Sequence, residues 1–389
     1  MMPPLTAEQD TALTALLDAV RAGSRVSVLT GPAGSGKTTV MRTFVERLIA
    51  DGYDVRLFAP TNKAALRLAA TTGRDVSTIH SALYSKIWED EAGDIRFANP
   101  RAIVDKRQVA IVDEASMVGS RLANDIETTF PENAAIVYVG DPNQIPPVED
   151  TWGAPMLAPT AHLDTIHRQA NDNPIIAFAM AIRLGKGKPW LAEWVAKYQT
   201  PDAAVYLMQI PLHDVVHWYI GAILAGLDVQ AIAWTHAQRV AFNADVRAIF
   251  DARGWDRRVV IRENDRDRGI VNGDVWTFKA ARKLAYGGHV GTLVDETCTP
   301  PRTINRVYLA ADDLWEAAPT AWRDFRKQHR YVTRVTDGYC VTIHSAQGSQ
   351  WDVVLILVDP RLFDAAQRRL LYTAVTRAAK RVILVLLGG

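Results

Sequence analysis

The stretch Gly31-Pro32-Ala33-Gly34-Ser35-Gly36-Lys37-Thr38 decides the fold class of this 389-residue chain. It follows residues 26–29, an apolar run of strand length, and precedes a helical pattern that continues to about residue 50. Glycines in such a loop let backbone N–H groups point inward around phosphate oxygens, and the helix N-terminus adds partial positive charge. The order of strand, glycine-rich loop and helix therefore predicts a phosphate-binding loop in an α/β fold.

The composition is that of an ordinary globular protein. Hydrophobic residues make up 48% and charged residues 22% of the chain, which excludes a disordered protein. The 44 Lys and Arg residues nearly balance the 43 Asp and Glu residues, so a globally basic nucleic-acid coat is excluded, although a local positive channel is not. Two cysteines, Cys298 and Cys340, are too few for a disulfide framework or a four-thiolate zinc site and favour a reducing compartment.

The chain gives no targeting or membrane signal. Residues 1–6 lack a basic segment followed by an apolar one, and the apolar run at 353–358 is far shorter than the roughly 20 residues that span a bilayer. We therefore expect a soluble, cytoplasmic protein without membrane contacts.

Alternating strand-like and helical stretches predict parallel sheets with helices on both faces. The alternation breaks around Gly93, where two strand-like runs flank a polar turn, and again from residue 270, where short glycine-punctuated strands follow. Two α/β cores in tandem, each with a β insertion, explain this order. The predicted units are a first core at 1–170 with a β-hairpin at about 84–106, a second core at 171–269 and 336–389, and a small β-barrel-like insertion at 270–335.

Two carboxylates, Asp113 and Glu114, directly follow the apolar run at residues 109–112. Active groups in open α/β sheets lie at the carboxyl ends of the strands. Asp113 and the Thr38 hydroxyl would hold Mg²⁺, Lys37 would reach the β- and γ-phosphates, and Glu114 would orient and deprotonate the attacking water. The alternative is a solvated acidic pair or a helix N-cap.

A proline-stiffened loop at residues 140–148, with the sequence GDPNQIPPV, follows the next strand-like run. Gln144 in this loop would probe the γ-phosphate and report its loss. The alternative is a proline-rich turn without function.

Taken in order, these motifs and two later stretches resemble those of a superfamily 1 helicase. The later stretches are TIHSAQG at 342–348 and YTAVTR at 372–377. The sequence DEASM at 113–117, together with the loop at 140–148, is most similar to the RecD/Dda-like branch of superfamily 1B, whose members move 5′→3′ on single-stranded DNA. The resemblance implies two RecA-like cores, ATP and Mg²⁺ as cofactors, and a DNA helicase.

The resemblance also implies the residues of the nucleotide site. Gln9 would read the adenine edge, and Arg168 and Arg377 would stabilise charge on the transferred phosphoryl group, an effect worth roughly 10³–10⁵ in rate for an arginine finger. Because both arginines lie far along the chain from Lys37, the nucleotide would bind in a cleft between the cores, and hydrolysis would open and close it. The expected catalytic residues are Lys37, Glu114, Gln144, Arg168 and Arg377; the expected nucleotide-binding residues are Gln9, Gly31, Pro32, Ala33, Gly34, Ser35, Gly36, Lys37, Thr38, Thr39 and Gly348; the expected metal ligands are Thr38 and Asp113.

A DNA path is implied by further matches. Thr61 lies where a strand gives way to a helix, so its neighbouring N–H groups would contact a phosphate. His80 and His344 match strand-contacting motifs, although a lone histidine is more often structural, and Gly348 would permit close backbone approach. Many relatives carry a lysine after the motif histidine, where this chain has Ser345. The expected DNA contacts are Pro60, Thr61, Asn62, His80, Trp88, Phe97, Thr235, Thr342 and His344.

The predicted hairpin lies where relatives carry a pin that splits duplex DNA. Trp88 or Phe97 would stack on the last base pair, a contact worth about 1–3 kcal/mol. A plain surface hairpin is the alternative. The basic and aromatic residues at 323–331 would contact DNA or form a solvated helix.

Single-stranded DNA and forked duplex DNA are the expected partners, together with single-strand-binding, replication, repair or recombination proteins. Three other functions remain open: a translocase subunit of a nuclease complex that does not unwind, an RNA-directed helicase, and an ATP-binding switch without turnover. The presence of Glu114, Gln144 and Arg377 together speaks against the switch, which needs none of them.

Overall fold

The computed structural model describes the chain over residues 4–89, 95–100, 108–147, 156, 158–165, 173–185, 193, 204–262, 268, 270, 272–283, 289–296, 299–309, 335–358 and 365–386. Within these ranges only the backbone is described at 85–89, 95–100, 280–283, 306, 308–309 and 365–366.

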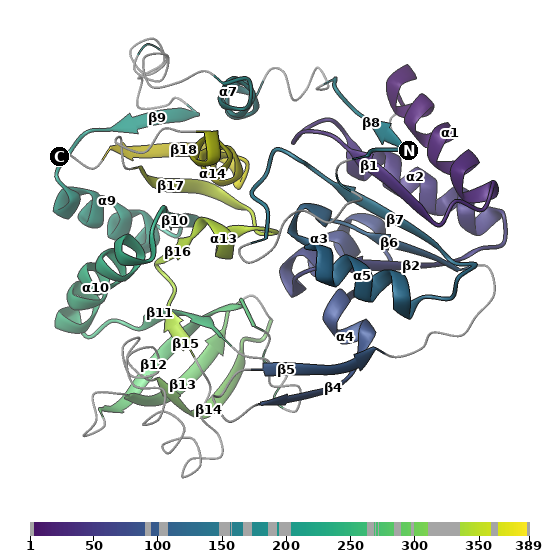
Figure 1. Ribbon diagram of the computed structural model, residues 1–389. Helices are drawn as coiled ribbons and strands as arrows, with labels where there is room; N and C mark the ends of the chain where they lie inside the picture. The colour runs from purple at the N-terminus through teal and green to yellow at the C-terminus, as the bar shows by residue number, and fades with distance from the viewer. Residues whose placement is uncertain are drawn as a thin grey trace.

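The first core is a six-stranded parallel sheet with helices on both faces (Figure 1). Its strands, in spatial order, are β3 (Val76–Thr78), β2 (Asp54–Ala59), β6 (Gln108–Val112), β7 (Ala135–Gly140), β1 (Val26–Thr30) and β8 (Ala161–His162). Its helices are α1 (Ala7–Arg21), α2 (Lys37–Ala50), α3 (Asn62–Thr72), α4 (Ile79–Leu83), α5 (Ser120–Thr129) and the 3₁₀ turn η1 (Ala115–Met117).

The alternation of side chains along β6 explains why both faces of this sheet are covered. Val109 and Ile111 belong to a buried cluster with α1 and α2, whereas Ala110 and Val112 belong to another with α5. A strand buried on both faces is mostly apolar; all five residues of β6 are buried, and the four that follow Gln108 are apolar.

The second core is a five-stranded parallel sheet. Its strands, in spatial order, are β16 (Cys340–Thr342), β10 (Val229–Ala233), β17 (Trp351–Val358), β18 (Ala378–Leu386) and β9 (Val205–Met208). Its helices are α7 (Pro174–Arg183), α9 (Leu212–Leu224), α10 (His236–Arg253), α13 (Ile343–Ala346) and α14 (Ala365–Val375). One buried cluster joins α7 and α14 to the sheet, and another joins α9 and α10 to it. The predicted α/β class with two parallel sheets is confirmed.

A five-stranded antiparallel sheet lies between α10 and β16 in the chain. Its strands, in spatial order, are β14 (Arg302–Leu309), β13 (His289–Asp295), β12 (Val275–Lys283), β11 (Arg257–Ile261) and β15 (Val335–Asp337). The sequence analysis assigned residues 257–261 to the second core, but β11 pairs antiparallel with β12 and β15. This difference has a simple cause, because a short apolar run fits a parallel and an antiparallel strand equally well.

A two-stranded hairpin, formed by β4 (Tyr84–Glu89) and β5 (Ile95–Pro100), projects from the first core. In Figure 1 it extends on the side where the antiparallel sheet of β11 to β15 lies. At its base, the Tyr84 hydroxyl donates a hydrogen bond to Asp125 on α5 (2.6 Å), which fixes the start of β4 to the core. None of the helices in the described ranges is long and apolar enough to cross a membrane.

Candidate nucleotide-binding site

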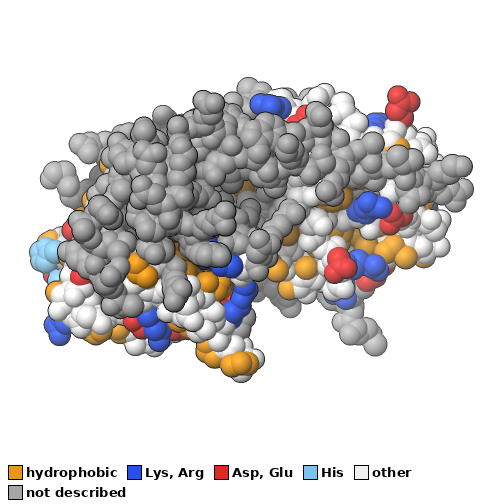
Figure 2. Space-filling model, turned by 90° about the horizontal axis from the view of Figure 1, so that it is seen from below, with side chains coloured by type: hydrophobic (Ala, Val, Ile, Leu, Met, Phe, Trp, Pro, Cys, Tyr) orange, Lys and Arg blue, Asp and Glu red, His pale blue; other side chains and the backbone are white. Residues whose placement is uncertain are grey.

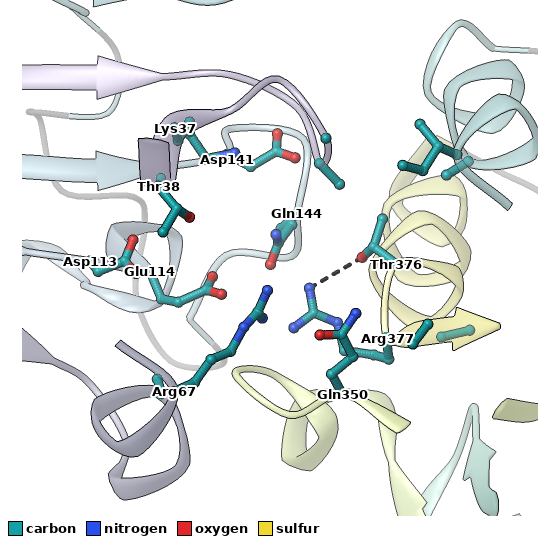
Figure 3. Close-up of a pocket in the computed structure, with 18 of the residues that line it drawn as sticks. Lys37, Thr38, Arg67, Asp113, Glu114, Asp141, Gln144, Gln350, Thr376 and Arg377 are labelled. Atoms are coloured by element: carbon teal, nitrogen blue, oxygen red, sulfur yellow. Dashed lines mark hydrogen bonds between the residues drawn. The ribbon is translucent and has the colours of Figure 1, made fainter. Parts of the chain in front are cut away.

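A cavity of about 560 Å³ lies between the two cores. The first core contributes Lys37, Asp113 and Glu114 to its lining, and the second core contributes Gln350 and Arg377. Figure 3 shows the two groups facing each other across the cavity. Residues separated by more than 300 positions in the chain therefore share one site.

The phosphate loop owes its shape to its glycines. Gly34 and Gly36 have φ angles of 81° and 84°, in the left-handed region that favours glycine. A Cβ atom on Gly31 would lie 2.6 Å from the Ser35 hydroxyl oxygen, so only glycine fits there. The Lys37 Nζ donates hydrogen bonds to the carbonyls of Gly31 (2.7 Å) and Pro32 (2.9 Å) and so lies across the loop.

Gln9 lies against this loop, as the resemblance implied, but its side chain is already engaged. Its Oε1 accepts from the N–H of Thr6 (3.2 Å) in the N-terminal cap of α1, and its Nε2 donates to the carbonyl of Ser35 (3.4 Å). Thr39 lies in the first turn of α2, where its N–H donates to the carbonyl of Gly36 (3.0 Å). Neither residue is among those that line the cavity.

Asp113 and Glu114 follow β6 and line the cavity. Burial and the neighbouring Glu114 raise the pKa of the Asp113 carboxyl above its ordinary value. Glu114 has a φ angle of 52°, and among the described residues it is the only non-glycine with a positive φ. Such a conformation costs of order 1–3 kcal/mol and is found most often at functional sites.

Gln144 is nine-tenths buried and lines the same cavity. Its Oε1 atom accepts no hydrogen bond from any described residue. Asp141 shapes the loop around it, because its Oδ1 accepts from the backbone N–H (2.9 Å) and the Nδ2 (3.3 Å) of Asn143. A buried amide oxygen without a partner is costly, so this atom is ready to accept a hydrogen bond from a bound molecule or from water.

Arg377 is 3% exposed and reaches the cavity from the end of α14. Its guanidinium donates to the carbonyl of Thr373 (3.0 Å), the hydroxyl of Thr376 (3.1 Å) and the carbonyl of Ser349 (3.5 Å). Burial lowers the pKa of this guanidinium and Glu114 opposes the shift, but an arginine stays charged under either influence.

Arg67, on α3, is a site residue that the sequence analysis missed. It lines the cavity, and Figure 3 shows its guanidinium beside the carboxylate of Glu114 and near the guanidinium of Arg377, as a second positive group. Ala64 and Thr71, three residues before and four residues after Arg67 on the same helix, line the cavity too, but no pattern in the sequence shows that this face of the helix meets the cleft.

Three of the expected DNA-contacting residues occupy the same structural position. Thr61, Thr235 and Thr342 each lie where a parallel strand gives way to a helix and cap that helix, accepting a hydrogen bond at Oγ1 from the backbone N–H of its third residue. Pro60 and Asn62 flank the first of these caps. Burial lowers the pKa values of the expected contacts His80 and His344, which favours their neutral forms.

Gly348 is not among the residues that line the nucleotide cavity, and its expected role in nucleotide binding stays a prediction. A Cβ atom there would lie 3.0 Å from the Thr61 hydroxyl and 3.1 Å from the Cβ of Ala64, and its φ is +73°. The missing side chain lets the second core approach the start of α3. The structure does not describe Arg168, Cys298, residues 323–331, or the side chains of Trp88 and Phe97.

Comparison with known proteins shows the family of the chain. Residues 4–202 match the family model described as an AAA domain, and residues 337–385 match the UvrD-like helicase C-terminal domain. Because the first match covers half of the chain, the chain belongs to the AAA domain family. The proteins to which the chain is similar include RecD2, RecD and Dda proteins.

Two of these similar proteins are named as DNA helicases. The chain is 29% identical to the ATP-dependent RecD2 DNA helicase of Deinococcus radiodurans, over 92% of this chain and 47% of that protein. It is 31% identical to the ATP-dependent DNA helicase dda of Enterobacteria phage T4, over 47% of this chain and 43% of that protein. The chain thus spans about half of the length of these relatives.

The fold is also found in solved structures. The Bacteroides Pif1 helicase in complex with ADP-AlF3 and single-stranded DNA has a TM-score of 0.57 at 17% identity, covering 98% of this chain and 92% of that one. This likeness concerns the fold alone.

Proposed function

We propose that this chain is an ATP-dependent DNA helicase that moves 5′→3′ on single-stranded DNA and separates the strands of a forked duplex. One observation carries the proposal: Lys37, Glu114 and Arg377 line a single cavity although the third belongs to the other core. A nucleotide bound there would be held from both sides, so its hydrolysis would change how the cores are held together.

The residues of the cavity divide the chemistry among them. Lys37 would leave the loop carbonyls for the β- and γ-phosphates, and Glu114 would take a proton from the attacking water. Gln144, with its unpartnered Oε1, would orient that water. Arg67 and Arg377 would stabilise the negative charge that develops on the transferred group.

Mg²⁺ fits the oxygen donors at this site. The Thr38 hydroxyl and the Asp113 carboxylate line the cavity, and both are the hard oxygen ligands that this ion prefers. The raised pKa of Asp113 reflects a buried negative charge that a cation would stabilise. When bound, the ion would neutralise charge on the phosphates.

DNA would be held mainly through its backbone. The helix N-termini at Thr61, Thr235 and Thr342 offer backbone N–H groups with partial positive charge, to which phosphate oxygens bind without regard to base sequence. On the face that Figure 2 shows, the Lys and Arg side chains of the described residues lie among Asp and Glu side chains. On that face binding would therefore depend on such local contacts.

A second candidate is a translocase that moves on DNA as part of a larger complex. The RecBCD enzyme subunit RecD of Mycobacterium tuberculosis is 26% identical over 92% of this chain and 66% of that protein. A chain acting in this way would hydrolyse ATP on single strands without opening a duplex alone.

Strand separation on two forked substrates tests the proposal, one with only a 5′ tail and one with only a 3′ tail. We expect ATP-dependent opening of the 5′-tailed substrate and its loss in Lys37→Ala. Arg47→Ala, an exposed position on the same helix, serves as the matched control and should behave as wild type. Opening from the 3′ tail would contradict the polarity, and ATP hydrolysis without opening would favour the translocase.

A further inference from the structure

Tyr372 crosses from the second core into the phosphate loop of the first. The side chain is 1% exposed and comes from α14. Its hydroxyl accepts a hydrogen bond from the backbone N–H of Ala33 (3.0 Å) and donates one to the carboxylate of Asp141. A phenol has one proton to donate, so this pairing fixes its direction: Ala33 to Tyr372 to Asp141.

The N–H of Ala33 belongs to the loop whose N–H groups bind phosphate oxygens, and Ala33 lines the nucleotide cavity. The Tyr372 hydroxyl oxygen therefore occupies a donor that a nucleotide would use. A phosphate oxygen and this hydroxyl compete for the same hydrogen, and the charged acceptor forms the stronger bond.

Asp141 connects the Tyr372 hydroxyl to the loop that presents Gln144. Its Oδ2 accepts from Tyr372, while its Oδ1 accepts from the backbone N–H of Asn143 (2.9 Å). The phosphate loop and the loop that presents Gln144 both belong to the first core, yet a side chain of the second core links them.

We propose that Tyr372 is a positioning residue that couples occupancy of the phosphate loop to the docking of the second core. When a nucleotide phosphate takes the N–H of Ala33, the hydroxyl loses that donor and its hold on the loop. The second core and the Gln144 loop are then free to adopt a new arrangement. This inference rests on the proposed nucleotide site and names a contact through which that site would control the cleft.

The test compares Tyr372→Phe with Thr373→Val in the full chain. Thr373 also bonds across the cleft, where its Oγ1 accepts from the N–H of Ile145 (3.2 Å), but it does not touch the phosphate loop. Tyr372→Phe should bind ADP about 3- to 10-fold more tightly without DNA, the factor that one hydrogen bond is worth, because its competitor is gone. Thr373→Val should leave the Kd for ADP within about twofold of wild type, since a contact away from the loop offers no competition.

A second readout separates coupling from stability. Tyr372→Phe should reduce the stimulation of kcat by single-stranded DNA while the KM for ATP falls, a split that simple loss of stability would not produce. Because this variant leaves the buried Asp141 with one partner fewer, Asp141→Asn is measured beside it. That variant keeps the phenol but weakens its acceptor, and should shift the Kd in the same direction by a smaller factor.

The outcomes are distinguishable. An unchanged Kd in Tyr372→Phe, with wild type binding ADP normally, would overturn this inference and leave the proposed ATPase site intact. Equal tightening in Thr373→Val would also overturn it, because a loosened cleft would then suffice as the explanation. Failure of the wild type to bind ADP or ATP would instead contradict the proposed function itself.

Discussion

Ile145 is bound to Thr373 across the cleft between the cores: its backbone N–H donates to the Thr373 hydroxyl at 3.2 Å. The carbonyl of Ile145 accepts from the Nε2 of Gln347 (3.2 Å), so the second core holds both backbone groups of this residue. The side chain is 3% exposed and packs into the cluster of the second core that also contains Phe178 on α7. The residue after Gln144 is thus an anchor in the other core.

Ile145→Ala should weaken this anchor. Removing a buried isoleucine side chain costs about 2–5 kcal/mol, and here the lost contacts join the two cores. We expect a several-fold drop in DNA-stimulated ATP hydrolysis, while the Kd for ADP changes little. Ile182→Ala is the control, because Ile182 lies in the same cluster but within the second core. It should lower the melting temperature without reducing DNA stimulation, and equal loss of stimulation in both variants would refute the anchor.

Glu114 should show opposite effects on catalysis and on stability. Glu114→Gln keeps the shape but loses the base, so we expect ATP turnover to fall by about 10²–10⁴-fold with nucleotide binding retained. Glu114→Gly also loses the base, but it relieves the backbone at φ 52°. Thermal unfolding should therefore give Glu114→Gly a higher melting temperature than Glu114→Gln. A lower melting temperature for the glycine variant would show that the φ angle stores no strain.

Arg25 should matter for stability and not for turnover. Its guanidinium donates to four backbone carbonyls where α5 ends and the chain turns toward β7, those of Glu127 (2.5 Å), Phe130 (2.9 Å), Pro131 and Ala134. Removing it leaves these acceptors without their charged donor, so Arg25→Ala should lower the free energy of unfolding by about 3 kcal/mol.

Chemical denaturation measures this loss. Arg21→Ala is the matched control, since its ion pair with Asp51 lies on the surface, where such pairs contribute little. Comparable losses of unfolding free energy in the two variants would mean that water satisfies the four carbonyls as well as Arg25 does. ATP turnover below the melting transition should be unchanged in both.

The sequence predicts what depends on local pattern and strand order. Lys37, Glu114 and Gln144 could be brought together in advance because the carboxyl ends of neighbouring parallel strands meet at one edge. The role of Arg377 could be predicted only from the family resemblance, because the neighbouring sequence does not show which surface this side chain faces. Arg67 and Tyr372 depend on how closely α3 and α14 approach across the cleft, which no periodicity encodes.

Lys63 should make DNA binding depend on pH. Its side chain lies 5.6 Å from the ring centre of Trp351, and burial lowers its pKa to about 8. Asp274 opposes that shift, whereas Arg258 and Arg262 add to it. Lys63 follows Asn62 at the start of α3, where we expect a DNA phosphate, so its charge would strengthen the contact below pH 8 and be lost above it.

The affinity of the chain for single-stranded DNA should therefore fall between pH 7 and pH 9. Lys63→Arg, which stays charged, should remove this dependence, and Lys63→Met should bind at every pH as wild type does at pH 9. The unfolded chain holds this proton up to its higher pKa, so the lysine's own contribution to stability should rise from pH 8 upward. Fluorescence anisotropy at two salt concentrations shows whether the loss of DNA affinity is the loss of a phosphate contact. Such a loss also lowers the salt dependence of binding by about one ion, whereas a change in protein stability does not. A pH profile that is identical in wild type and Lys63→Arg would exclude Lys63 from the DNA contact.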